Sequence, residues 1–83
     1  MQATVSAQEL FGSIKMARRI AGRTTTGAAG WKFDNGKLSV EWAGAELTLE
    51  GKGDGQGTVR VSDADMRGLA RLPAPKGDIL VQY

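Results

Sequence analysis

Two amino acids that carry much of protein chemistry are missing from this 83-residue sequence, which contains no cysteine and no histidine. Without cysteine the chain cannot form a disulfide, and without either residue it cannot build the common zinc sites. The Ser-His and Cys-His pairs that activate many nucleophiles are excluded as well. The acidic residues lie scattered in turns and beside helix caps, Asp63 and Asp65 among them, without a visible partner. We therefore expect no enzyme activity, no catalytic residue, no metal and no cofactor.

Long apolar runs are also missing. No stretch approaches the roughly 20 apolar residues of a membrane span, and no basic segment followed by an apolar run opens the sequence. These absences predict a soluble, cytoplasmic protein with no membrane partner, folded as a single domain over residues 1–83. Eleven Lys and Arg residues against nine Asp and Glu residues give a net charge of +2. This balance permits a nucleic-acid partner without requiring one.

One eight-residue sequence pattern occurs twice in similar form. Residues 5–12 read Val-Ser-Ala-Gln-Glu-Leu-Phe-Gly, and residues 61–68 read Val-Ser-Asp-Ala-Asp-Met-Arg-Gly. Each copy predicts the end of a strand, a serine N-cap, an acid three residues later and an apolar residue after it. The pattern favours a capping role over a catalytic role for four residues: Ser6, Glu9, Ser62 and Asp65.

The hydrophobic periodicity predicts an α+β fold with the order β-α-β-β-β-β-α-β, in which two helices cover one face of an antiparallel sheet. The first helix is expected to place Leu10, Ile14, Ala17, Ile20 and Ala21 on one core-facing side. Asn35-Gly36 predicts a tight hairpin turn. The predicted helices span about residues 7–21 and 63–72, and the predicted strands span residues 1–5, 31–33, 38–42, 45–49, 58–61 and 79–83.

Two features allow a functional and a structural interpretation. Residues 51–57 alternate glycine with polar residues, as a phosphate-binding loop does, but they lead into a strand and not into a helix. We favour a flexible hairpin loop there. Trp31, Phe33 and Trp42 could stack on bases as in single-strand binders. Because they alternate with polar residues on neighbouring strands, we favour burial in the core.

In its order of elements the chain resembles one domain of a DNA polymerase sliding clamp of the bacterial beta-clamp type. Domains of that family contain two β-α-β-β-β repeats whose helices begin with phrases similar to residues 5–10 and 61–66. The hairpin at residues 34–40 and the passage from residue 69 to residue 79 are similar too. The likeness covers nearly the whole chain, but the last two strands of the second repeat have no counterpart, and a clamp subunit carries two or three domains.

The resemblance implies a non-enzymatic module whose helices pass over duplex DNA. Basic residues gather on the helix faces that would meet the phosphates, while Glu41, Glu46 and Glu50 lie on the polar face of the strands. An ordinary solvated helix surface would carry such residues as well. The resemblance implies six DNA-binding residues: Lys15, Arg18, Arg19, Arg23, Arg67 and Arg71.

The shortened second repeat also predicts self-association. An incomplete sheet leaves open edges, and open edges pair with other strands. We expect a homo-oligomer, either a symmetric dimer or a closed ring. Its predicted interface is the apolar last strand: Ile79, Leu80, Val81 and Tyr83. The alternative function is a small protein-interaction or regulatory module that has the same fold and no DNA role.

Overall fold

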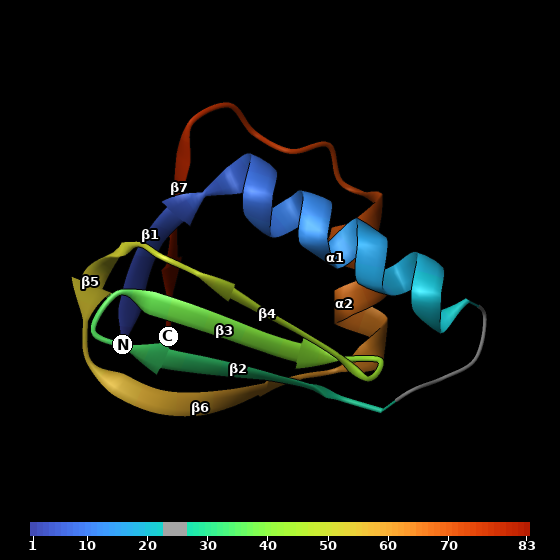
Figure 1. Cartoon of the computed structure of the whole chain (residues 1–83), viewed down its shortest axis with the longest axis horizontal. Helices are drawn as coiled ribbons and strands as arrows, with labels where there is room; N and C mark the ends of the chain where they lie inside the picture. The colour runs from blue at the N-terminus through green and yellow to red at the C-terminus, as the bar shows by residue number, and fades with distance from the viewer. Residues whose placement is uncertain (23–26) are drawn as a thin grey trace.

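The computed structural model describes residues 1–22 and 27–83, which form two helices and two antiparallel sheets (Figure 1). The α+β class is confirmed, with the elements in the predicted order and one short strand added. The elements are β1 (Gln2–Ser6), α1 (Ala7–Ala21), β2 (Ala29–Asp34), β3 (Lys37–Trp42), β4 (Ala45–Leu49), β5 (Lys52–Asp54), β6 (Gln56–Val61), α2 (Asp63–Arg71) and β7 (Asp78–Gln82).

The strands divide between two sheets and do not form one. One sheet has the order β4-β3-β2-β6 and the other the order β5-β1-β7. The division occurs where β5 runs directly into β6. Gly55 stands between them at a φ of 84°, a conformation that glycine adopts without strain. The chain can therefore leave the pairing with β1 and enter the pairing with β2 within one residue.

The two copies of the repeated pattern lie in two halves of the chain that pair their strands with each other. The first copy ends β1 and starts α1, and the second copy ends β6 and starts α2. The strand that follows α1 is β2, and it pairs with β6. The strand that follows α2 is β7, and it pairs with β1. Each half therefore supplies the partner strand for the other half.

Both predicted serine N-caps are confirmed. The Ser6 hydroxyl accepts the Glu9 N–H at 3.3 Å, and the Ser62 hydroxyl accepts the Asp65 N–H at 3.1 Å. Each bond satisfies one of the N–H groups that a helix start leaves without an intrahelical partner. The sequence pattern thus accounts for both serines by their role in the fold.

The core lies between the helices and the inner faces of the sheets. Trp31, Phe33 and Trp42 are buried, at 7%, 2% and 3% exposure. Their rings are therefore unavailable for stacking on bases, and the core interpretation is correct. The indole N–H of Trp31 donates to the Met66 sulfur at 3.3 Å, so α2 contacts β2 through this pair. The other large buried side chains are Val5, Leu10, Phe11, Ile14, Leu38, Val40 and Leu49.

One residue of the predicted core face of α1 lies outside the core. Ile20 is 68% exposed, whereas Leu10, Ile14 and Ala17 are buried as predicted. Ile20 lies beside the β4 edge and lines an open groove with Ala45 and Leu47, where it stays in contact with water. Helical periodicity predicts which side of a helix faces the core but not where the underlying sheet ends.

Candidate functional site

Lys15 and Arg67 bind the two helices together. The Lys15 ammonium donates to the carbonyl oxygens of Ala70 at 2.7 Å and Leu72 at 2.5 Å, at the end of α2. Arg67 Nη1 donates to the carbonyl oxygen of Gly22 at 2.7 Å, at the end of α1. Each helix therefore lends a cation to the last carbonyls of the other. Those carbonyls have no intrahelical partner and carry the negative end of the helix dipole.

Asp63, the first residue of α2, holds together a second set of side-chain contacts. Its carboxylate accepts from Arg67 Nε at 2.8 Å and from the Trp42 indole N–H at 3.2 Å. The Arg67 guanidinium also lies 5.8 Å from the centre of the Trp42 ring. The Asp63 side chain is only 14% exposed, so the expectation of an acid without a partner is wrong. The spacing of Asp63 and Arg67 by four residues is a sequence signal for this ion pair.

This geometry predicts that Arg67 stabilises the fold. Arg67→Ala would leave the Gly22 carbonyl and the half-buried Asp63 carboxylate short of a donor. We expect the free energy of unfolding to fall by about 1–2 kcal/mol. Arg71→Ala on the same helix is the matched control, because Arg71 is exposed, and its effect should stay within about 0.5 kcal/mol. Urea unfolding of both variants measures the difference, and equal midpoints would contradict the structural role of Arg67.

A basic groove runs between the two helices. Its lining residues are Lys15, Arg18, Arg19, Ala70 and Arg71, and its volume is about 280 Å³. Arg19 and Arg71 are exposed, while Lys15 and Arg18 are half-buried. The Nε of Arg18 is buried and has no hydrogen-bond partner within residues 1–22 and 27–83. A buried guanidinium N–H without an acceptor is costly, and here it belongs to a residue that lines the groove.

The structure thus brings four of the six predicted DNA-binding residues to one groove. Arg67 lies apart from it, in the contact with Asp63 and Trp42. Lys15 reaches the groove but already donates to two carbonyls. Arg23 lies outside the described residues. The groove depends on the pairing of α1 with α2, which helical periodicity alone does not predict.

The predicted interface strand β7 pairs only with β1, and its other edge has no partner in the described part of the chain. Ile79 and Val81 are half-buried and pack against the core. Leu80 and Tyr83 are 52% and 79% exposed. The apolar run is therefore covered on one face only.

The described residues hold no group of three or more acidic side chains that could bind a metal ion. Neither helix combines the length and the apolar character that crossing a lipid bilayer requires, as far as the described residues extend. Comparison of the chain with protein-family models, with curated proteins and with solved structures finds no match in any of the three.

Proposed function

We propose that the chain is a non-enzymatic, clamp-like module that self-associates and binds duplex DNA along the groove between α1 and α2. The observation that carries the proposal is the convergence of Lys15, Arg18, Arg19 and Arg71 on one groove. Three guanidinium groups present planar, fixed donors that match phosphate oxygens.

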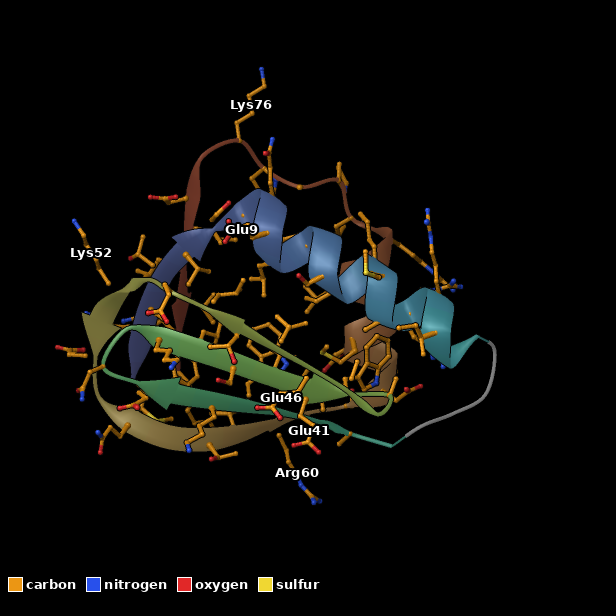
Figure 2. All side chains as sticks on the ribbon, in the orientation of Figure 1. Glu9, Glu41, Glu46, Lys52, Arg60 and Lys76 are labelled. Carbon is orange, nitrogen blue, oxygen red and sulfur yellow. The ribbon has the colours of Figure 1, made fainter. Side chains whose placement is uncertain are left out.

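The groove is lined by four basic side chains and by no acidic one among the described residues, which favours a polyanion over a single small anion. Figure 2 labels Glu41 and Glu46 on β3 and β4, and neither of them lines this groove. Contacts to the phosphate backbone carry no sequence information, so the module would bind duplexes of any sequence.

A short fluorescent duplex, titrated with the protein at several salt concentrations, tests this function. Arg19→Ala/Arg71→Ala removes two exposed charges from the groove without touching the core. Losing two phosphate contacts should reduce the slope of log K against log salt by about 2 units. The affinity should fall by about tenfold or more at low salt.

The matched control is Lys32→Ala/Lys52→Ala, which removes the same net charge from exposed positions on β2 and β5. Its affinity and salt slope should stay close to those of the unmodified protein. Equal losses in the two double variants would indicate attraction by net charge alone and would contradict a site in the groove. No duplex binding at about 50 mM salt would contradict DNA binding altogether.

A second candidate function is a protein-interaction module with no DNA role. The exposed apolar side chains of Leu80 and Tyr83, beside the unpaired edge of β7, favour it. Strand addition at such an edge gives backbone hydrogen bonds and apolar contacts together. Under this function the groove variant Arg19→Ala/Arg71→Ala would leave partner binding unchanged.

A further inference from the structure

The outer face of the four-stranded sheet carries side chains in three rows that cross the strands, and two of these rows are internally paired. In one, Lys37 lies 3.9 Å from the carboxylate of Glu50, and Gln56 donates to Asp34 at 3.0 Å. In the next, the hydroxyls of Ser39 and Thr48 lie 3.3 Å apart. Neighbouring strands therefore present complementary groups along most of this face.

The third row is not complementary. Strand pairing places Glu46 on β4 directly opposite Glu41 on β3, then Gly30 on β2, then Arg60 on β6. Like charges directly opposite each other destabilise a sheet. Gly30 has no side chain to bridge the gap, and two strand spacings of about 4.8 Å separate β3 from β6. The three charged side chains are labelled in Figure 2, and none forms an ion pair with another described residue.

The two charges at the ends of this row stand on the two edges of the sheet. β4 and β6 are the outermost strands, and each pairs on one side only within the described chain. Their inner faces carry half-buried apolar side chains that pack against the core. These are Ala45 and Leu47 on β4 and Val59 and Val61 on β6. Both edges thus combine unpaired backbone groups with apolar side chains, which is the composition that accepts another strand.

An apolar groove borders the β4 edge. It has a volume of about 150 Å³ and lies between α1 and β4. Met16 and Ile20 of α1 line it and are 67% and 68% exposed. A strand added to β4 would lie against these two side chains and remove them from water. The groove therefore gives the β4 edge an apolar floor as well as backbone donors and acceptors.

We propose that a second copy of this chain adds its β6 edge to the β4 edge, antiparallel, with Arg60 of the second copy opposite Glu46. The occupant is a second copy because β6 matches β4 along its whole length in this one register. On the outer face, Arg60 lies opposite Glu46, the acid that lacks a cation. Thr58 lies opposite Thr48, and Gln56 lies opposite Glu50.

On the inner face, the same register pairs apolar side chains. Val59 lies opposite Leu47, and Val61 lies opposite Ala45. A shift by one residue would turn every side chain to the wrong face.

The register also fixes the kind of assembly. Within one chain β4 and β6 already run antiparallel, since each pair along β4-β3-β2-β6 is antiparallel. The second copy therefore joins in nearly the same orientation, using a different edge from the first. Such a head-to-tail contact leaves one free β4 and one free β6 at the ends, so it continues into a ring or a filament.

The edge of β7 matches β4 less well. Its outward residues are Asp78, Leu80 and Gln82. Placed against β4, they would bring a carboxylate and an apolar side chain to the acidic edge instead of a cation. A symmetric β7 dimer is thus an alternative outcome of the test. The inference deepens the self-association within the proposed function, and it does not depend on DNA binding.

Charge reversal tests the contact by sedimentation equilibrium without DNA. Glu46→Lys and Arg60→Glu should each weaken self-association by about tenfold at low salt, because each places like charges opposite one another. An equimolar mixture of the two variants should recover association. One kind of mixed contact pairs the native Arg60 with the native Glu46, and the other pairs the two substituted side chains, whose charges are exchanged but still opposite. Glu46→Lys also removes the clash with Glu41, so it should unfold at the same or a higher urea concentration than the unmodified protein.

Three results would overturn the inference: an unmodified protein that stays monomeric at its highest soluble concentration, single variants that associate as well as the unmodified protein, or a mixture that fails to recover. Loss of association in Leu80→Ala with none in Glu46→Lys would move the interface to β7. Duplex binding measured on the same variants separates the two proposals. Glu46→Lys leaves the helix groove intact, so a failed β4–β6 contact with retained DNA binding would contradict only this inference.

Discussion

Gly53→Ala is expected to lower the free energy of unfolding by about 3 kcal/mol. Gly53 pairs with Ala3, where β5 lies against β1. A Cβ on Gly53 would overlap the carbonyl oxygen of Gln2 and would lie 2.8 Å from the Gln2 carbonyl carbon and 3.0 Å from Cα of Ala3. These are backbone atoms, which cannot turn aside as a flexible side chain can. β5 would have to move away from β1, and the pairing of the two strands would be lost.

Gly12→Ala is the matched control for this substitution. Gly12 lies in the middle of α1, and apart from its chain neighbours and the backbone of its own helix no heavy atom of the described residues would lie within 4 Å of its added Cβ. Alanine should therefore stabilise the protein by about 0.5–1 kcal/mol through its helix propensity. Urea unfolding followed by far-UV circular dichroism compares the two. A Gly53→Ala midpoint equal to that of the unmodified protein would contradict the close contact between β5 and β1.

The glycine-rich segment also shows where local sequence reasoning stops. Alternating glycine and polar residues over residues 51–57 predict a flexible loop, yet Lys52–Asp54 is a strand. Gly51 and Gly53 are glycines because the backbone of β1 approaches them closely. The reason for the pattern therefore lies nearly 50 residues away in the sequence. A long-range approach of two backbones leaves no periodic signal that distinguishes it from a loop.

The sequence also predicts only part of the candidate site: which basic residues share a helix side, but not what they contact. Helical periodicity predicts that Lys15, Arg18 and Arg19 share a side of α1, and it predicts Arg67 and Arg71 on one side of α2. It does not predict that α2 ends against Lys15 or that Arg67 turns toward Trp42. Those contacts depend on how the two halves exchange strands. The sequence therefore finds the basic residues, and the structure separates those already bonded within the fold from those open to an anion.

This separation sharpens the proposed function. Lys15 and Arg67 donate to backbone carbonyls of the opposite helix, so removing them would disturb the helix pair before it tested any ligand. Arg19 and Arg71 are exposed and carry no such bond in the described structure. A loss of DNA binding in variants of Lys15 or Arg67 would therefore be ambiguous. A loss in variants of Arg19 and Arg71 with unchanged urea unfolding would not.

Ile14→Ala should destabilise the protein by about 3–4 kcal/mol, whereas Ile20→Ala should change its stability by less than about 0.5 kcal/mol. The two residues are the same amino acid on the same helix, and the apolar periodicity places both on its core side. Ile14 is 1% exposed and Ile20 is 68% exposed. Truncating Ile14 leaves a cavity that the surrounding core cannot fill, while truncating Ile20 removes atoms that already contact water.

Thermal unfolding at low protein concentration measures this pair. In a domain of this size a change of 1 kcal/mol in the free energy of unfolding shifts the unfolding midpoint by roughly 4–8 °C. The two variants should differ in stability by ~3 kcal/mol, so Ile14→Ala should unfold about 12 °C or more below Ile20→Ala. Equal midpoints would contradict the position of the last turn of α1. At high protein concentration, β6 of a second copy would add to the β4 edge and cover Ile20 beside it. Ile20→Ala should then weaken self-association while leaving the monomer as stable as before, because the same side chain that adds nothing to the core contributes to the contact.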